Sequence, residues 1–558
     1  MKQLINKYRY IALFLIVLMG LFLRFYGLGS NPPSLNWDEA STGYNAYSIL
    51  KTGKDEYGNF LPLSIRSFDD YKPPLYTYLD VPFIGLFGLN EAAVRLPSAI
   101  LGTLTVPLIY FLIIELFRKR KVESGNADVL GLVGAFFFAI SPWSLQFSRA
   151  AYEGNIGLFF LVGALLFFLQ SLRNQKLLPV SSVFFMLSMY SYHSFRLVIP
   201  VLFLFMAPLF YKELLKMKTM VVACLLLFAI LVIPIFYSFI AGSSGTGARL
   251  SMVTLFGPSP NLEHSINQLE YDKTHHDLLG EILHNRRIVY FLAVTKGYLD
   301  HYNPDFLFLH GDGGRQHHAV DMGMMYLLDL PLLFLGVLVF FRDMDRKKWL
   351  LAGFLFAAPL PSAITTGTPH PVRAIAMLPP LIILSGVGVI WLGEKVFSIE
   401  YSVLSIKMKN SLIVLGLLMF AFNLVYYFHQ YYVHTPLEYG DFWQYGYKDA
   451  LSYAKQHENE FQNIVITYKY DQPYVYYLFY NRVDPSWYQQ HWNFTGTGEM
   501  PRFERKIGKY DFRNIHFGDD QKMKDTLFIG APDEIPQDKT IKTIYFLNGV
   551  EAFRIAKT

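Results

Sequence analysis

The chain contains a series of apolar runs, each close to the length that crosses a lipid bilayer, and these runs constrain its fold more than any other feature. A membrane-spanning helix needs about 20 predominantly apolar residues. Hydrophobic residues make up 53% of the 558-residue chain and charged residues only 17%, a balance unsuited to a soluble surface. We interpret the runs as about eleven transmembrane helices. They lie near residues 10–27, 91–117, 128–147, 155–171, 178–192, 196–211, 219–240, 326–341, 349–364, 373–393 and 410–427.

The distribution of Lys and Arg predicts the topology, because short cytoplasmic loops carry an excess of these residues. Alternate connections are basic, and they contain Lys2, Lys7 and Arg9; 118–121; Arg173 and Lys176; Lys212, Lys216 and Lys218; Arg342 and 346–348; and Lys395, Lys407 and Lys409. The N-terminus is then cytoplasmic, and the first run is an uncleaved anchor because no small-residue cleavage site follows it. We expect a multi-pass protein of the plasma or inner membrane, with long external loops at 28–90 and 241–325.

The residues after the last apolar run have the mixed polar and aromatic composition of a compact soluble domain. Residues 448–457 are typical of a helix, and 463–468, 526–529 and 544–547 are typical of strands. Asn548 and Gly549 form a two-residue hairpin signal between apolar segments. The sequence therefore predicts a transmembrane domain at 1–427 and a small extracytoplasmic α/β domain at 428–558.

Charge and cysteine content exclude several classes of protein. The net charge is only +5, and the basic residues lie in short loops, so the chain has no nucleic-acid footprint. The single cysteine, Cys224, excludes an intramolecular disulfide and a Cys/His zinc cluster. A divalent cation bound by the His- and Gly-rich segment 310–318 stays open, although two adjacent histidines are poor chelating geometry. We assign no certain cofactor and no metal ligand.

Two motifs in the first external loop carry groups suited to chemistry. Asp38 and Glu39 stand in the segment N-W-D-E-A, and Lys72 stands in D-D-Y-K-P-P-L-Y, where Pro73 keeps the lysine extended. Each motif also has a structural interpretation. Asp38 can cap a helix with Glu39 in its first turn, and Lys72 can extend to a lipid headgroup. Glu91 and Arg95 are spaced for an ion pair on one helix, which we interpret as structural.

The motifs N-W-D-E, Y-K-P-P-L-Y and V-R-L-P-S-A, at these separations, resemble the GT-C membrane glycosyltransferases. The resemblance is to the branch containing the protein O-mannosyltransferases (glycosyltransferase family 39) and the aminoarabinose lipid A transferases. It is strongest over residues 1–200, and N-P-D-F-L-F at 303–308 and T-P-H-P-V-R-A at 368–374 extend it more weakly. The resemblance implies that Asp38 and Glu39 engage the acceptor and that Lys72 lies near the donor phosphate.

The chemistry of sugar transfer from a polyprenyl phosphate agrees with this assignment. The acceptor hydroxyl needs a base, for which Asp38 is the candidate, with Glu39 as a positioning group. The leaving phosphate needs cations, and basic side chains at the outer ends of predicted spans can supply them: Lys72, Arg149, Arg196 and Arg373. Further candidates for the substrate pocket are Tyr71, Tyr76, Glu153, His193, Asp312, Arg315 and His370.

We therefore predict a glycosyltransferase, a hexosyl- or pentosyltransferase that inverts the sugar by family resemblance, acting at the outer face on a protein, glycan or lipid hydroxyl. One alternative is a transporter or flippase of lipid-linked sugars, which needs polar groups at mid-membrane depth. The predicted spans are poor in such groups, and the chain shows no internal repeat. A non-catalytic scaffold is the other alternative, in which the acidic pair only begins a helix.

Overall fold

The computed structural model describes residues 2–68, 70–118, 126–240, 254–257, 260–342, 344–397, 406–492 and 505–558. Within these ranges seven helices are long and apolar enough to cross a membrane, or eight if the bent pair Ala127–Ile140 and Pro142–Ser148 is one span. The predicted count of about eleven is not confirmed, because three apolar runs form helices of only 14, 12 and 12 residues. The basic residues 119–121 and part of the second loop, 241–253, lie outside the described residues.

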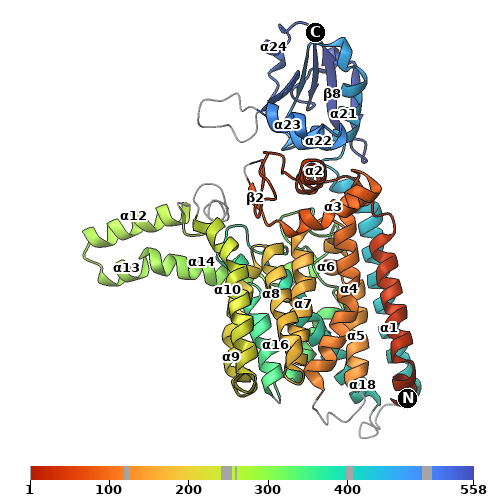
Figure 1. The fold of residues 1–558 in the computed structure, drawn as a ribbon, viewed down its shortest axis with the longest axis vertical. Helices are drawn as coiled ribbons and strands as arrows, with labels where there is room; N and C mark the ends of the chain where they lie inside the picture. The colour runs from red at the N-terminus through yellow and green to blue at the C-terminus, as the bar shows by residue number, and fades with distance from the viewer. Residues whose placement is uncertain are drawn as a thin grey trace. The chain divides into compact units, whose positions relative to one another are not determined.

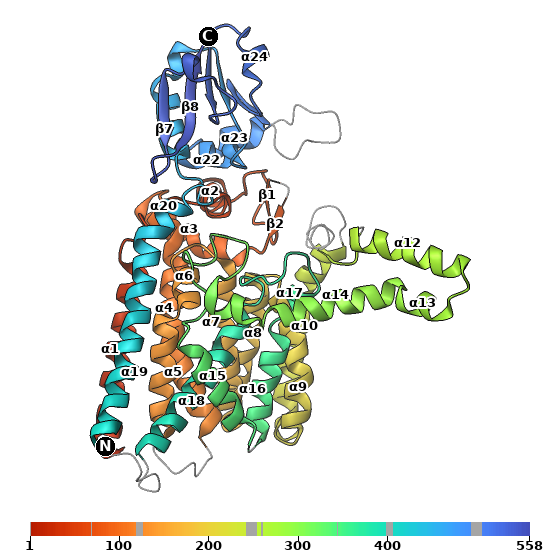
Figure 2. The same ribbon diagram turned by 180° about the vertical axis from the view of Figure 1, so that it is seen from behind.

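The chain divides into two compact units, and the first consists of Met1–Gly20, Gly102–Gln146 and Gly154–Val425. Its helices, some of which continue into the second unit, run alongside one another as a bundle, with α12, α13 and α14 projecting sideways (Figures 1 and 2). They are α1 (Lys2–Phe25), α4 (Glu91–Phe117), α5 (Asn126–Ile140), α6 (Pro142–Ser148), α7 (Glu153–Ser171), α8 (Leu178–Ser191), α9 (Phe195–Lys216), α10 (Lys218–Ile240), α12 (Pro260–Thr274), α13 (Leu278–Leu283), α14 (Arg286–Asp300), α15 (Asp329–Phe340), α16 (Arg346–Ala357), α17 (Leu360–Ala363), α18 (Leu378–Phe397) and α19 (Ile406–His429).

Helices α15 and α18 pack backbone against backbone through two glycines. A Cβ atom on Gly336 would lie 1.8 Å from the Leu384 carbonyl oxygen, and one on Gly388 would lie 2.0 Å from the Leu332 carbonyl oxygen. Small residues allow this close approach, which is a common way to stabilise helix pairs in membranes. The 12-residue α15 is thus held by its neighbour, although it is too short to be a conventional span.

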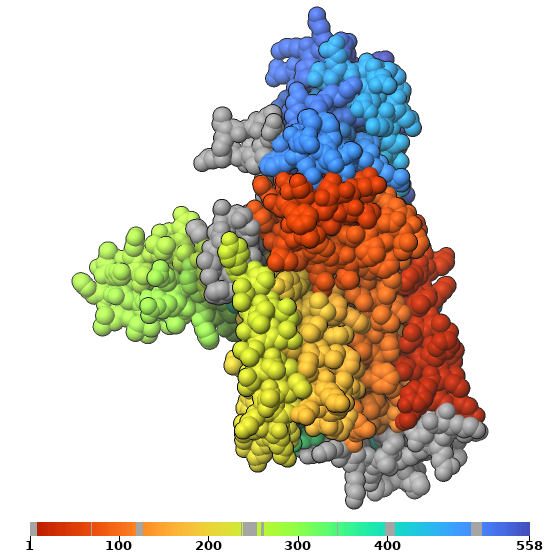
Figure 3. All heavy atoms as spheres, viewed as in Figure 1, coloured from red at the N-terminus to blue at the C-terminus, as the bar shows by residue number. Residues whose placement is uncertain are grey.

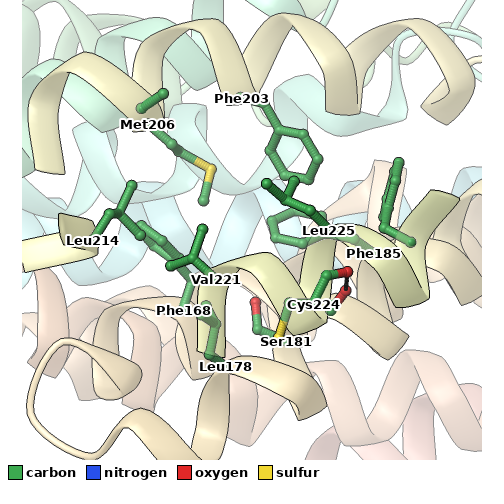
Figure 4. A pocket seen from close by; sticks show the side chains of 13 residues that line it. Phe168, Leu178, Ser181, Phe185, Phe203, Met206, Leu214, Val221, Cys224 and Leu225 are labelled. Atoms are coloured by element: carbon green, nitrogen blue, oxygen red, sulfur yellow. Dashed lines mark hydrogen bonds between the residues drawn. The ribbon is translucent and has the colours of Figure 1, made fainter. Parts of the chain in front are cut away.

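An apolar cavity of about 230 Å³ lies between α7, α8, α9 and α10 (Figure 4). Phe168, Phe185, Phe203 and Met206 contribute to its wall, and Cys224 lies beside it. The Ser182 hydroxyl donates to the Cys224 carbonyl at 3.5 Å, so this polar group at the wall joins α8 to α10. The cavity therefore offers no catalytic group.

The second unit consists of Leu21–Leu101, Phe147–Glu153 and Tyr426–Thr558, so residues of the first loop share a unit with the C-terminal residues. Its six-stranded sheet has the order β4-β5-β3-β6-β8-β7, with β3 parallel to β5 and β6 and the other pairs antiparallel. The elements of this unit are α2 (Trp37–Thr52), β1 (Ile65–Ser67), β2 (Asp70–Lys72), α3 (Leu75–Phe87), α20 (Thr435–Glu438), α21 (Tyr447–Gln456), β3 (Asn463–Ile466), α22 (Pro473–Tyr480), α23 (Pro485–His491), β4 (Arg505–Ile507), β5 (Tyr510–Phe512), α24 (Phe517–Asp520), β6 (Thr526–Gly530), β7 (Lys542–Tyr545) and β8 (Glu551–Lys557).

The predicted helix and strands of the C-terminal residues are confirmed as α21, β3, β6 and β7. A hairpin joins β7 to β8, which pair antiparallel, but its connection is residues 546–550 rather than the predicted two residues. Gly549 has a φ of 82°, a conformation that glycine adopts without steric cost, and its N–H donates to the Phe546 carbonyl at 3.0 Å. The pattern did not reveal the short strands β4 and β5. The predicted boundary at residue 428 stays a prediction.

Helix α22 packs against α2, and these contacts join the first loop to the C-terminal residues (Figure 1). The Tyr476 hydroxyl donates to the Leu35 carbonyl at 3.2 Å, and the Phe68 N–H donates to the Tyr474 hydroxyl at 2.9 Å. A Cβ atom on Gly43 would meet the Phe479 ring at 2.7 Å, so α2 approaches α22 closely at this glycine. Helix α2, which carries the acidic pair, is therefore held by a helix from a distant part of the chain.

Candidate active site

A capping box positions the acidic pair at the start of α2. The Asn36 side chain accepts from the Glu39 N–H at 2.9 Å, and the Glu39 carboxylate accepts from the Asn36 N–H at 3.2 Å. This reciprocal arrangement satisfies two backbone donors that a helix start leaves unpaired. The interpretation of Asp38 as the cap is wrong, because Asn36 has that position. Asp38 and Glu39 both lie in the first turn, and they point to different surroundings.

Glu39 is buried and holds three segments together. The Arg95 guanidinium donates to both of its carboxylate oxygens, at 2.9 and 3.0 Å, and the Ala151 N–H donates to it at 2.9 Å. Both side chains of this ion pair are at most 1% exposed. Arg95 also donates to three backbone carbonyls, those of Leu28, Pro32 and Ser34. A bidentate ion pair of this kind fixes the relative orientation of its two side chains, so Glu39 is a rigid support beside Asp38.

The expected pair between Glu91 and Arg95 is wrong. Arg95 instead pairs with Glu39, and the Glu91 carboxylate accepts from the Lys448 ammonium at 2.7 Å. The physical reason is burial: a guanidinium that is 0% exposed needs a full set of acceptors, and the α2 carboxylate supplies two of them.

Asp38 faces outward, and it forms an ion pair with Lys72. The Lys72 Nζ lies 2.7 Å from the Asp38 carboxylate, whose side chain is 46% exposed, whereas the lysine is 7% exposed. Lys72 also donates to the Asp38 carbonyl at 3.3 Å and lies 5.1 Å from the centre of the Phe68 ring. The structure therefore brings together the two groups that the motifs singled out. Asp38 remains open to solvent, whereas its counter-ion Lys72 is buried.

Three further candidates lie in this unit. Glu153 begins α7, and its charge interacts with those of Lys72 and Asp38. Tyr71 is half-buried on β2, beside Lys72. Tyr76 is buried, and its hydroxyl donates to the Val94 carbonyl at 2.8 Å. Glu153 is thus a second carboxylate close to the Asp38–Lys72 pair, while Tyr76 supports the start of α4.

Arg149 is buried in the same unit, and each of its three guanidinium nitrogens donates to a protein acceptor. Its guanidinium donates to the Tyr431 hydroxyl at 2.9 Å and to the carbonyls of Leu23 and Asn31 at 2.7 and 2.9 Å. It therefore joins three segments of the unit. Phosphate binding by Arg149 stays a prediction.

Asp80 is a buried carboxyl group that the sequence reasoning did not find. It is 0% exposed on α3, and no hydrogen bond to its carboxyl oxygens is present among the described residues. Burial, together with the negative charge of Glu39, raises the pKa of Asp80 well above its usual range. Its sequence context, L-Y-T-Y-L-D-V-P, is that of an apolar helix and gives no signal of this role.

The other candidates lie in the first unit and form two groups. In one, the Asp312 carboxylate is 2.8 Å from the His317 ring nitrogen, and the His317 ring centre is 5.1 Å from that of His370. Nearby, burial lowers the pKa of His301 to about 4, and this ring accepts from the His370 N–H at 3.1 Å. Polar side chains from 301–318 and 365–373 are thus brought together.

Arginine residues accompany both groups of the first unit. Arg373 donates to the Thr365 hydroxyl at 2.7 Å and to the Thr366 carbonyl at 2.8 Å, next to the histidine group. Arg196 forms the second group with His193, whose ring nitrogen is 3.0 Å away, and it also donates to the Met189 carbonyl. Arg315 is exposed. Among the residues that the structure describes, no group of three or more His, Cys, Asp or Glu side chains is arranged to hold a metal ion.

The comparisons with known proteins bear on the fold. Residues 71–237 match the sequence model of the family described as dolichyl-phosphate-mannose-protein mannosyltransferase. The structure is similar to that of ArnT from Cupriavidus metallidurans in the apo state, with a TM-score of 0.55, 12% identity and 97% of each chain covered. A search of curated protein sequences found no match.

A second similar structure is the archaeal oligosaccharyltransferase AglB from Archaeoglobus fulgidus, solved with an inhibitory peptide and a dolichol-phosphate. The TM-score is 0.50 at 13% identity, and the match covers 84% of this chain but 63% of AglB, so this chain spans less than two thirds of that protein's length. The chain has the fold of the GT-C membrane glycosyltransferases. The family match over residues 71–237 and the likeness of the fold to ArnT agree with the GT-C resemblance drawn from the motifs.

Proposed function

We propose that this protein is a glycosyltransferase that moves a hexose or pentose from a polyprenyl-phosphate donor to a hydroxyl of a protein, glycan or lipid acceptor at the outer face of the membrane. The observation that carries the proposal is the asymmetry of the acidic pair. Asp38 is open to solvent and paired with Lys72, whereas Glu39 is buried in a fixed ion pair. The GT-C fold and the dolichol-phosphate named with AglB support the class of donor.

The proposed reaction uses the chain's own groups in one displacement. The acceptor oxygen attacks the anomeric carbon, the bond from that carbon to the phosphate oxygen breaks, and the hydroxyl proton passes to the Asp38 carboxylate. Inversion at the anomeric carbon follows from this single attack. The polyprenyl phosphate leaves as an anion, so it needs positive charge and no proton.

Lys72 has a double role in this proposal. In the structure its ammonium group bonds to Asp38. A donor phosphate arriving beside Lys72 competes for that ammonium, and the lysine then shares its charge between the two anions. Donor binding thereby frees Asp38 to accept a proton only when the sugar is in place. Further proposed phosphate contacts are Arg149, Arg196 and Arg373. Glu153 is proposed to line the acceptor site as a second carboxylate.

The test uses the purified full chain with a radiolabelled polyprenyl-phosphate sugar and an envelope extract as the source of acceptor. We expect transfer by the parent and a loss of about 100- to 10,000-fold in Asp38→Asn, the usual size of a general-base contribution. Asp519→Asn is the matched control, because this aspartate is exposed on α24 in the same unit and far along the chain from α2. Lys72→Ala is expected to raise the KM for the donor as well as lower kcat.

Two outcomes contradict the proposal. Normal transfer by Asp38→Asn at unchanged expression and thermal stability would show that Asp38 is not the base. Movement of the labelled lipid between leaflets without any transfer would favour the flippase.

A further inference from the structure

The helices α12, α13 and α14 form an arm whose apolar side chains face outward. Leu278, Leu279, Ile282 and Leu283 on α13 are each at least 50% exposed, as are Phe291 and Leu292 on α14. Six large apolar side chains on one short structure exceed what a surface in contact with water normally carries in one place. Figure 3 shows the arm uncovered on the visible face along most of its length.

The inner side of the arm is polar, which reverses the usual order of a helical hairpin. The Asp272 carboxylate lies 2.5 Å from the His284 ring nitrogen, and the Ser265 hydroxyl donates to the His284 carbonyl at 2.6 Å. A Cβ atom on Gly280 would lie 2.4 Å from the Asp272 carboxyl carbon, so α12 and α13 meet at these groups. The apolar residues are therefore not needed to hold the arm together, and they are available to an outside partner.

The arm is attached at a defined level of the helical bundle. The hydroxyls of Tyr298 and Tyr302 donate to the carbonyls of Phe356 and Leu355, at 3.2 and 3.0 Å, and the Asp300 carboxylate accepts from the Thr368 hydroxyl at 2.9 Å. These contacts lie at the end of α16 opposite its basic start at 346–348. In Figures 1 and 2 the arm extends sideways from this end of the bundle. Helices α13 and α14 lie on the side of the arm nearer the other end of the bundle, and α12 lies on the opposite side.

The apolar face of the arm continues the surface that the bundle presents to lipid. Ile230, Ile233 and Tyr237 on α10 are each more than 60% exposed, as a lipid-facing helix requires. In Figures 1 and 2 the arm leaves the bundle near one end of α10, and the end of a membrane-spanning helix is where hydrocarbon gives way to headgroups. An apolar helical face at that level matches the interfacial helices that lie in the plane of a membrane.

Two basic side chains indicate the chemistry of the headgroup level. Arg286 and Arg287 are exposed in the first turn of α14, and that turn contains no acidic residue. Positive charge is unfavourable at a helix N-terminus, because the backbone N–H groups there are themselves positive. A phosphate group between the arginines and the N–H groups satisfies both. Lipid phosphates occupy that level of the membrane.

We propose that the arm 260–300 lies on the membrane surface, with the apolar face of α13 and the residues Phe291 and Leu292 inserted among phospholipids and with Arg286 and Arg287 at their phosphates. The partner is the phospholipid bilayer around the protein. The test of this surface does not depend on sugar transfer.

The experiment places a nitroxide label on the full chain in liposomes of phosphatidylcholine and phosphatidylglycerol. Cys224→Ser removes the only native cysteine, and Ile282→Cys and Phe291→Cys provide two independent label sites on the apolar face. Asn267→Cys is the matched control, because this exposed residue shares the polar face of α12 with Glu263 and Glu270. All three sites are surface positions, so the fold does not depend on them.

We expect the ratio of collisions with oxygen to collisions with a water-soluble nickel chelate to be several-fold higher at residues 282 and 291 than at residue 267. Oxygen concentrates in hydrocarbon and the chelate stays in water, so the ratio reports depth. Equal ratios at all three sites would overturn the proposal, because the arm would then stand in water. Low collision rates with both reagents at 282 and 291 would also overturn it, because a protein surface would then cover the arm.

Discussion

Two ion pairs one residue apart at the start of α2 have opposite surroundings. Glu39 and Arg95 are sealed from solvent and bonded on every side, whereas Asp38 is open and shares one lysine. Burial turns the first pair into a structural element, because removing either partner leaves an uncompensated charge in a medium that solvates it poorly. Exposure leaves the second pair open to solvent, as the proposed function requires. The same kind of side chain therefore serves rigidity at one position and, in the proposed function, chemistry at the next.

The largest expected effect is the difference in the free energy of unfolding between a Glu39 variant and an Asp38 variant. Glu39→Gln breaks the buried pair and is expected to lower the free energy of unfolding by about 3–5 kcal/mol. Asp38→Asn is expected to change stability by about 1 kcal/mol or less, since a half-exposed ion pair contributes little. The measurement is the thermal unfolding midpoint of the purified protein in detergent. Equal midpoints for the two variants would remove the contrast between the pairs.

A smaller effect concerns a third buried carboxyl group, Glu56. This residue belongs to the first loop, and its charge interacts with that of Arg505 among the C-terminal residues of the same unit. Burial raises its pKa from 4.5 to about 7, even though the charge of Arg505 opposes this, and Asp55 raises it further. Tyr57, Tyr474 and Tyr488 surround the same guanidinium. The folded protein therefore binds the Glu56 proton more tightly than the unfolded chain.

The direction of the pH dependence follows from that difference. The stabilisation from protonated Glu56 is complete below about pH 4.5 and is lost as the pH rises through about 7. Relative to the parent, Glu56→Gln should thus gain stability between pH 5 and pH 8, on the order of 2–3 kcal/mol. Thermal unfolding across this range measures the change, with Glu460→Gln, an exposed residue, as the control. Parallel curves for parent and Glu56→Gln would contradict the assignment.

The smallest effect tests how the capping box supports the buried pair. Asn36→Ala removes the acceptor for the Glu39 N–H and is expected to cost about 1 kcal/mol, whereas Asn36→Ser should retain most of it. Transfer activity should fall less than in Asp38→Asn, because the carboxylates remain. The unfolding midpoints of the two Asn36 variants, compared with the parent, decide the point: a serine variant as unstable as the alanine variant would show that the cap is not the cause.

The sequence was sufficient for some features and insufficient for others, for physical reasons. Local patterns predicted β3, β6 and the turn at Asn548 and Gly549, because these depend on neighbouring residues. The proximity of Asp38 and Lys72 came from motif resemblance. No pattern in the sequence predicted the Glu39–Arg95 pair, because its members are 56 positions apart and Glu91 is a partner for Arg95 that lies closer in the sequence.

The membrane spans also show what local sequence patterns do not predict. Apolar runs mark which segments avoid water, but a run does not reveal how many of its residues remain in one helix. The segment 128–147 bends by 55° at Ser141, and 349–364 is divided between α16 and α17. The sequence also did not reveal the buried carboxyl of Asp80, which has no hydrogen-bond partner among the described residues, because its burial depends on the packing of α3 against α2.

The contacts between α2 and α22 have a consequence for the order of events during synthesis. Leu35 and Tyr476 are joined across 441 positions, and Asn31 is bonded to the Tyr431 carbonyl across 400. The segment that carries the acidic pair emerges from the ribosome early, yet the side chains that fix it are translated much later. The nascent protein therefore inserts its helices before its acidic pair is in place, and a ribosome that stalls short of residue 480 leaves an assembled bundle with an unfinished site.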